Sequence, residues 1–541
     1  MKSSPKGQSK VSAVPSFIAA FDSVLTRADQ DIPVELDSDS LETMLSKYSQ
    51  YASVLRADDV FSLLSSGDTA LIAGSIGRSL VESAVAERWY LSRGHGELPR
   101  SATLALEREN IVKQVHDQGL SVPNLERWNN PLPDARFAGA PVGPSLPNLQ
   151  SGLSTKAPSS VEAITQLPAP MVDLLAMCTH VNHAASWLTV IPGEHQLGVT
   201  ASTGFSALLA QSTGLSLAAV RGFPFESTVL DLVATSTAVH DFDLLAPLGK
   251  PKDIEASPGG RPATSMGRWL ENPPPSTYDI RLAKLELGAA KVWQLVNDAP
   301  NPFEGTTNVS NLTAALPYLA ARGILLRTLT SLRGGCSPFL APTGARMLLE
   351  QGSELAWRTA DTADAELASR YAMVMDDATD RKKSLEQKLL SRTSSRLGVE
   401  KLLYPLGRGP FAVDHRRSPQ NQKSRPPAPG VHLDALNLGD AEPNWGGLAY
   451  KLLTQVAHAT PLGVLHVVAR QIPGSGNPAL SHEMAALTID AACIGAALTF
   501  RSLAPVIAMQ AGLPTPTDWL RELFEAVRDV HAQAQLLHFL G

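Results

Sequence analysis

The chain has 541 residues, of which 44% are hydrophobic and 18% are charged, and its formal net charge is −6. This length exceeds one ordinary hydrophobic core and predicts about two to four domains, while the composition excludes an intrinsically disordered chain. The acidic balance excludes a surface that is basic overall, which is the usual mark of binding to nucleic acid or to an anionic membrane.

The three cysteines are sparse and odd in number, which is typical of buried thiols in a reducing compartment. The N-terminus lacks the sustained apolar core of a secretion signal. No run approaches the ~18 uninterrupted apolar residues of a membrane-spanning helix, since the best candidate, 491–512, contains Arg501 and Pro505. We therefore expect a cytoplasmic protein, and the abundance of Arg and Ala suggests a bacterial source.

The first half begins with a predicted flexible tail at residues 1–13 and continues with segments that carry apolar residues at helical spacing. A Pro-, Gly- and Ser-rich stretch over 122–170 predicts one long loop among them. The expected helices cover 14–29, 41–65, a segment around Arg78, 102–119, 171–190, 198–221 and 227–242. This half forms a predicted helical module over residues 14–246.

The second half follows a Pro- and Gly-rich stretch over 247–278, which predicts a linker between domains. A second long loop is predicted over 405–444. The expected helices cover 278–296, 311–333, a segment around Arg346, 363–396, 448–471, 481–510 and 517–539. This half forms a second predicted module over 279–541. Since no strand pattern of alternating residues is present, we predict an all-α fold.

One pattern occurs in both halves with the same internal spacing. The stretch 345–359 resembles the stretch 77–91, and three residue types match at an offset of 268 (346 minus 78). The matching residues are Arg78, Glu82 and Trp89 in the first half and Arg346, Glu350 and Trp357 in the second. The repeat, together with the common order of helices, predicts two homologous modules that arose by internal duplication.

A later histidine follows the same repeat. His180 and His458 each lie among apolar residues, 278 residues apart (458 minus 180), as loop insertions in the second copy would require. Such a histidine is compatible with a core residue held by one hydrogen bond. The sharper hypothesis is that each histidine faces the Arg–Glu pair of its own module. Although His183 lies three residues after His180, the second copy has Pro461 in its place, so no metal site is expected.

The Arg–Glu pair lies on one narrow stripe of its predicted helix. At 100° per residue, Arg78, Glu82, Val85 and Trp89 fall within about 60° of one another, at the edge of the apolar face. Two interpretations remain open: a partly buried ion pair that fixes helix register, and part of a ligand or catalytic site. The catalytic candidates are accordingly Arg346, Glu350 and His458, with Arg78, Glu82 and His180 as the paired copy.

This order of an Arg-x-x-x-Glu…Trp helix, a charged helix, a loop and a Leu-Leu-x-x-x-x-His helix resembles an uncharacterised family of helical bacterial proteins loosely grouped with HEPN-like domains. It covers 346–386 with 448–470, and 78–106 with 171–188. The resemblance implies a role in stress or phage defence, and for some members ribonuclease activity. The Arg…His strings starting at Arg88, Arg408 and Arg425 carry no weight, because chance predicts about two.

We therefore expect a regulatory or interaction protein, with a HEPN-like ribonuclease using the Arg/Glu/His cluster as the alternative. The sequence offers no phosphate-binding glycine loop, HExxH zinc motif or G-x-S-x-G elbow. No cofactor is expected. The expected partner is another protein or a second copy of the chain, with RNA only under the nuclease alternative and no membrane.

Overall fold

A computed structural model of the chain describes residues 16–30, 40–66, 70–93, 98–117, 119–120, 125, 168, 171, 174, 190–192, 199–201, 203–222, 227–240, 280–299, 309–332, 338–359, 445–468, 480, 482–511 and 514–538. The predicted tail, the predicted linker and His180 lie outside these residues.

The described part of the chain is helical, which confirms the predicted all-α class. It contains thirteen helices and one short antiparallel pair of strands, in which Val190 pairs with Ala201. The first-half elements are α1 Ser16–Gln30, α2 Leu41–Ser66, α3 Ala70–Leu91, α4 Pro99–Asp117, β1 Val190–Pro192, β2 Val199–Ala201, α11 Thr203–Arg221 and α12 Ser227–His240. The second-half elements are α14 Ile280–Asn297, α15 Val309–Ser331, α16 Leu340–Thr359, α20 Trp445–Ala457, α21 Pro461–Val468, α22 His482–Ala511 and α23 Thr517–His538.

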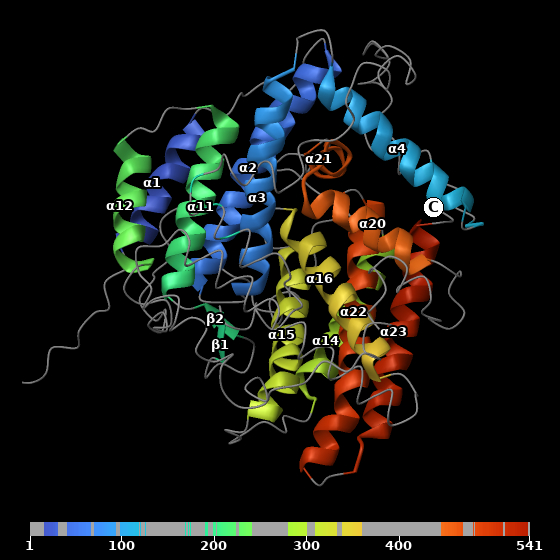
Figure 1. Cartoon of the computed structure of the whole chain (residues 1–541). Coiled ribbons are helices and arrows are strands. Elements are labelled where there is room, and N and C mark those ends of the chain that lie inside the picture. Colours follow the sequence, from blue (N-terminus) through green and yellow to red (C-terminus); the bar gives the residue numbers. More distant parts are fainter. Residues whose placement is uncertain are drawn as a thin grey trace, which may run out of the picture.

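The first half is a bundle built around the contact between α3 and α11 (Figure 1). Helix α2 packs on both of these helices, while α12 packs on α11 and α1. Gly77 lets α3 and α11 approach closely, because a Cβ at this position would lie 2.3 Å from a methyl group of Leu209. Apolar side chains fill the space between these helices, so each buries its apolar face within this half.

The second half repeats the same pairwise contacts with its own helices. Here α16 and α22 form the central pair, α15 packs on both, and α23 packs on α22 and α14. The central crossing is closer than in the first half, because an added Cβ at Gly495 would meet the backbone of Leu348 at 2.3 Å. Helices with corresponding places in the two predicted modules therefore have corresponding neighbours.

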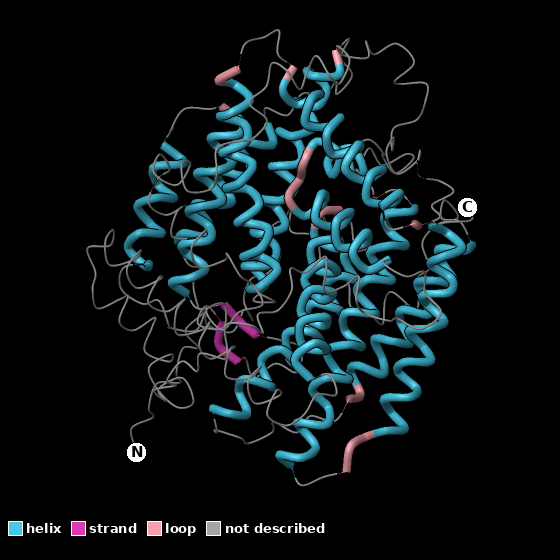
Figure 2. Tube along the Cα trace, turned by 45° about the vertical axis from the view of Figure 1, so that its right-hand side comes forward, coloured by secondary structure: helices cyan, strands magenta, loops and turns pink. Residues whose placement is uncertain are grey.

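The two halves share a packed interface. Helix α3 contacts α16, and α2 contacts α21. Helix α4 leaves the first half and lies along α20 and α21 of the second, as the two views show (Figure 1, Figure 2). Lys451 on α20 donates a hydrogen bond to the carbonyl of Asn110 on α4 over 3.2 Å. Strand β2 touches both α3 and α15, so contacts between the halves are spread over several elements.

Helix α22 is long and apolar enough, by length and composition, to cross a membrane, and among the described residues it alone meets that test. In the most apolar 18-residue stretch of this helix, 94% of the residues are buried inside the protein. This burial is what the central core helix of a bundle shows, and Asp490 and Cys493 lie on it fully enclosed.

The predicted helix over 448–471 is wrong in one respect, because it is two helices. Helix α20 ends at Ala457 and α21 begins at Pro461. Between them, the amides of Ala459 and Thr460 bond back to the carbonyls of Val456 and Gln455, and Ala459 has a positive φ of 47°. This is a Schellman C-terminal motif, and Pro461 is the cause: its ring cannot continue a helix but suits the first position of the next one.

Candidate functional site

The two repeated Arg–Glu pairs lie on α3 and α16, the helices that meet where the halves join. Arg78 Nε donates to Glu82 Oε1 over 3.0 Å, and Arg346 Nη2 lies 3.5 Å from Glu350 Oε2. The four side chains are between 15% and 32% exposed. The Arg–Glu contact expected within each helix is therefore present in both halves, at a partly buried position.

A polar stripe on α20 connects with the second of these pairs. Tyr450 and Thr454 are one helical turn apart, and His458 follows after another turn. Arg346 donates from Nη2 to the Tyr450 hydroxyl over 3.1 Å and from Nε to Thr454 Oγ1 over 3.2 Å, with its guanidinium 5.3 Å from the centre of the Tyr450 ring. These bonds fix Arg346 to α20.

His458 contacts the first half rather than the pair of its own module. Its Nδ1 lies 2.5 Å from Glu82 Oε2, between residues 376 positions apart. The direct contact of His458 is therefore with Glu82, and not with Arg346 and Glu350 as we predicted. Because Pro461 ends α20 early, His458 lies in the turn beyond this helix, beside α3. The groups in direct contact are Arg78, Glu82 and His458.

Glu82 is the electrostatic centre of this cluster. Burial alone would raise the pKa of Glu82, but the hydrogen bond and charge of His458, followed by those of Arg78, outweigh it and lower the pKa to about 2. The negative charge of Glu82 also interacts favourably with the guanidinium of Arg346. The carboxylate therefore remains ionised at neutral pH and joins positive groups from both halves.

Arg56 is a further residue near Glu82, and the repeat did not indicate it. Its guanidinium donates to the hydroxyls of Ser79 and Ser83 on α3, over 3.0 Å each, and lies 5.6 Å from the ring centre of Phe339 in the second half. Burial lowers the pKa of Arg56 to about 9, with the charge of Glu82 opposing. Arg56 therefore remains positive at neutral pH and supports the anionic state of Glu82.

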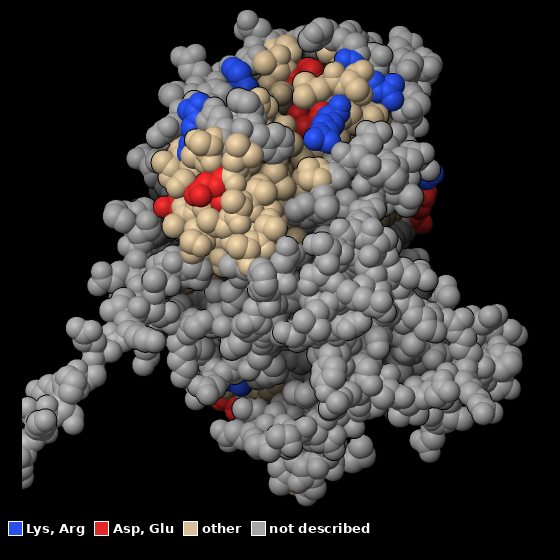
Figure 3. Space-filling view, turned by 60° about the vertical axis from the view of Figure 1, so that its left-hand side comes forward, with Lys and Arg blue, Asp and Glu red and all other residues tan. Residues whose placement is uncertain are grey.

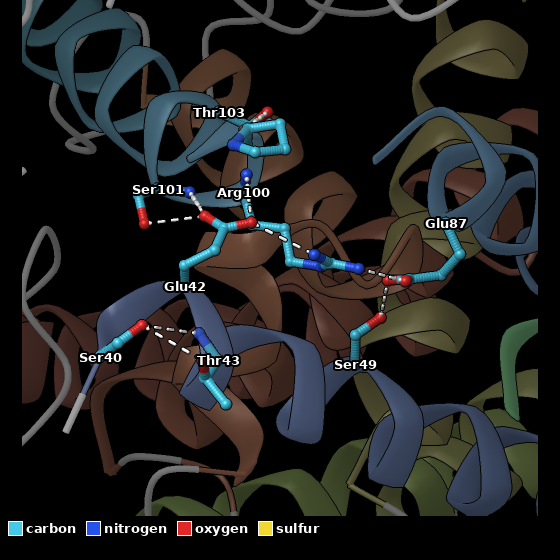
Figure 4. Close-up of polar contacts among 9 residues, drawn as sticks. Ser40, Glu42, Thr43, Ser49, Glu87, Arg100, Ser101 and Thr103 are labelled. Carbon is cyan, nitrogen blue, oxygen red and sulfur yellow. Dashed lines mark hydrogen bonds and ion pairs between the residues drawn. The ribbon is translucent and has the colours of Figure 1, made fainter. Parts of the chain in front are cut away.

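A second polar network holds the start of α4 against α2 and α3 (Figure 4). The guanidinium of Arg100 donates to Glu42 over 3.2 Å and to Glu87 over 2.5 Å. Glu42 also accepts from the amide and hydroxyl of Ser101, while Ser49 donates to Glu87. Because Arg100 and Glu87 are both buried, this network fixes the position from which α4 crosses to the second half.

A cavity of about 220 Å³ lies between these two networks. Glu82, Glu87, Tyr90 and Arg100 line its first-half side, and residues 458–461 line its second-half side. Arg346, Glu350 and Arg78 are not among its lining residues. Helices from both halves thus enclose one space, with the Glu82–His458 contact at its wall.

Glu107 on α4 also lines this cavity and touches the second half. Its Oε2 accepts the amide of Leu462 in the first turn of α21 over 2.9 Å, while Thr460 caps the same helix by accepting the amide of Gly463. Burial raises the pKa of Glu107 to about 7, against the opposing hydrogen bonds from Leu462 and Thr460. Glu107 therefore exchanges a proton near neutral pH.

The remaining predicted residues lie elsewhere or outside the description. The ring of Trp89 packs beside Tyr90 and under the guanidinium of Arg93, at 5.3 and 4.9 Å between centres. His180 is not among the described residues, so the paired copy of the site has no described histidine. Within the described ranges, no group of three or more His, Cys, Asp or Glu side chains could hold a metal ion.

The core of the second half contains another acid–histidine contact that the sequence did not indicate. Asp490 Oδ2 lies 2.8 Å from His531 Nδ1, and Gln535 lies 3.0 Å from the other ring nitrogen. The edge of the imidazole meets the Trp445 ring at 5.2 Å between centres. Burial would lower the pKa of His531, but Asp490 raises it overall. This contact joins α22, α23 and α20 inside the core.

Comparison with known proteins adds no relative. No family model, curated protein or solved structure matches the chain. The geometry described above is therefore the basis for any functional conclusion.

Proposed function

We propose that this protein is a cytoplasmic regulatory protein that binds a small molecule in the cavity between its two halves. The observation that supports this proposal is the shared wall of the cavity, where Glu82 from the first half contacts His458 from the second over 2.5 Å. Pockets between domains are common ligand sites, and they are typically apolar with a few polar groups.

A ligand at this position would couple the two halves. It would contact α2, α3 and α4 on one side and the turn before α21 on the other. Because such a ligand has its full set of contacts only when the halves are closed on one another, it would favour that arrangement over any more open one. A partner protein, or a second copy of the chain, would then respond to the ligand through the arrangement of the halves.

The proposed origin of this architecture is an internal duplication. The repeated Arg–Glu pairs and the matching neighbours of corresponding helices support it. The cavity, by contrast, includes Glu87 and Glu107, and 268 residues after Glu87 the second half has Leu355 (87 plus 268). We infer that after duplication the first half alone acquired the carboxylate at position 87, while the second half contributes residues 458–461 to the same cavity.

A panel of ring-sized compounds that are neutral, positively charged or negatively charged would test the proposal. We expect at least one of them to raise the melting temperature of the wild type and to slow hydrogen exchange in both α4 and α21. Ala86→Phe places a ring in the cavity and is expected to abolish both effects. The control, Leu230→Phe, changes an exposed side chain on α12. Absence of binding by every compound, or equal binding by Ala86→Phe, would contradict the proposal.

The alternative function is a HEPN-like ribonuclease, which the meeting of Arg78, Glu82 and His458 favours. Their side chains are 27%, 32% and 26% exposed, so substrate could reach them. An arginine can hold a phosphate while a histidine transfers a proton. On the face drawn in Figure 3, however, the described Lys and Arg side chains are scattered beside acidic ones and form no continuous strip.

Cleavage of a mixed-sequence RNA by the wild type, compared with Arg78→Ala, Arg346→Ala and His458→Ala, separates the alternatives. A nuclease with this site would lose at least about a hundredfold in rate in Arg78→Ala and His458→Ala, as expected for loss of acid–base or phosphate-binding groups. Equal rates in all four proteins, or no cleavage by any, would remove the ribonuclease from consideration.

A further inference from the structure

We propose that the ligand of the cavity is a small organic amine, whose ammonium group pairs with Glu107 and whose apolar body fills the space beside Leu45, Ala86 and Val464. This inference rests on the proposed function, since it names the ligand class for the same cavity.

The charges on the cavity wall favour a cation. Three carboxylates line it: Glu82, Glu87 and Glu107. Glu82 is paired with Arg78 and His458, and Glu87 with Arg100. Within the described part of the chain, Glu107 is the member of this trio that has no salt bridge. It accepts hydrogen bonds from the Leu462 amide and the Thr460 side chain, and the charge of Arg108 acts on it from its own helix. A carboxylate retains further acceptor sites after two such bonds, and a charged donor makes the strongest bond to it.

The rest of the wall favours an apolar body with few polar atoms. Leu45, Ala86, Pro461 and Val464 contribute apolar surface from both halves, and the aromatic ring of Tyr90 lies on the same wall. A cavity of about 150 Å³ accepts benzene in another protein, so about 220 Å³ accommodates a ring that carries a short aminoalkyl arm. An anion is disfavoured because, among the described lining residues, Arg100 already binds Glu42 and Glu87, and His458 already contacts Glu82.

Protonation of Glu107 gives this proposal a distinctive pH dependence. Burial raises the pKa of Glu107 to about 7, and the charge of Glu107 contributes, after burial, to the raised pKa of Tyr90. An ammonium ligand would have to displace the proton from Glu107 at lower pH. The affinity for an amine is therefore expected to fall about tenfold per pH unit below 7 and to level off above it. A neutral ligand would show no such dependence.

The test measures binding of benzylamine, benzyl alcohol and benzoate to the full chain by calorimetry at pH 6 and pH 8. We expect benzylamine to bind at least about tenfold more tightly than benzyl alcohol at pH 8, with proton release at pH 6 and binding weakened there. Glu107→Gln keeps an acceptor for the Leu462 amide and should reduce the preference for benzylamine to less than about threefold. The control, Glu525→Gln, changes an exposed carboxylate on α23 and should retain the wild-type preference.

Three outcomes would overturn the inference. If benzyl alcohol or benzoate binds as tightly as benzylamine, or if Glu107→Gln keeps the full preference for the amine, the ligand class is wrong while the cavity remains a ligand site. If none of the three probes binds and Ala86→Phe also behaves like the wild type in the wider panel, both the ligand class and the proposed function fail.

Discussion

At the scale of single residues, Glu82 is a carboxylate on which charged groups from both halves act. It contacts Arg78 and His458 directly, and its charge also reaches Arg56 and Arg346. These residues come from three helices and one turn in both halves. A carboxylate with so many positive neighbours contributes to stability only while it is ionised, which gives it a characteristic pH dependence.

Replacing Glu82 with Gln should lower the free energy of unfolding by about 1–2 kcal/mol at pH 7, the usual value of a charged hydrogen bond at a partly buried position. Its folded pKa of about 2 is below the unfolded value of 4.5. Its contribution is therefore present above pH 4.5 and is lost as the pH falls toward 2. Urea unfolding at pH 7 and pH 3 measures this effect, and a destabilisation of the same size at both values would contradict it.

Glu107 should have the opposite pH dependence. Its folded pKa of about 7 lies above the unfolded value of 4.5, so its contribution is complete below pH 4.5 and is lost as the pH rises through 7. Glu107→Gln removes this titration. Relative to the wild type, the variant is expected to gain stability between pH 5 and pH 8, which urea unfolding across this range would show. A constant difference between the two proteins would mean that Glu107 does not titrate there.

The sequence predicted five residues of the junction and the Arg–Glu pair within each helix, but not the contacts between the halves. The repeat singled out Arg78, Glu82, Arg346 and Glu350 because each occurs twice, and it added His458. It could not indicate that Glu82 and His458 meet, because contacts between distant segments leave no local pattern. The Glu42–Arg100–Glu87 network was missed for a different reason, because the repeat does not extend to Glu42. The position 268 residues after Glu42 is Ser310 (42 plus 268).

At the scale of elements, most helices could be predicted because their apolar residues recur at helical spacing. For example, α2 was expected over 41–65 and covers Leu41–Ser66, and α23 was expected over 517–539 and covers Thr517–His538. The break between α20 and α21 was missed although Pro461 was a visible signal for it. Both sides of the break are strongly apolar, and that periodicity outweighed one proline in the sequence-based prediction.

The turn between α20 and α21 offers a test of its geometry. Ala459 has a left-handed conformation that a Cβ disfavours, with φ at 47°. Ala459→Gly should therefore raise the free energy of unfolding by about 0.5–1 kcal/mol. Ala449→Gly, the matched control inside α20, should lower it by about 1 kcal/mol or more. Thermal unfolding of both variants measures this contrast, and destabilisation by Ala459→Gly would contradict the described turn.

The crossing of α16 and α22 offers a second test at this scale. A Cβ at Gly495 would lie 2.3 Å from the backbone of Leu348, which cannot move without shifting α16. Gly495→Ala should therefore lower the free energy of unfolding by about 2–4 kcal/mol, the range for overpacking against backbone. Gly288→Ala is the control, because its Cβ would meet only a methyl group of Val530 at 3.0 Å. Equal stability of the two variants in urea would contradict this close crossing.

At the scale of the whole molecule, the two halves are joined by charge, by packing and by α4. The two predicted modules did not indicate that the halves pack against each other, because a linker over 247–278 is equally compatible with separate domains. The contacts of α3 with α16, of α2 with α21 and of α4 with α20 make the junction part of the fold. The cavity exists only because these elements meet, so its function depends on the integrity of the junction.

The contact between Glu82 and His458 joins the halves at the cavity wall. Measuring its strength therefore tests the junction of the two halves most directly. A double-mutant cycle with Glu82→Ala and His458→Ala, followed by urea unfolding at pH 7, measures the coupling between the two side chains. We expect a favourable coupling of about 1–2 kcal/mol, typical of a partly buried charged hydrogen bond. Effects of the two substitutions that add to within about 0.3 kcal/mol would show that the residues do not meet, and would contradict the shared cavity.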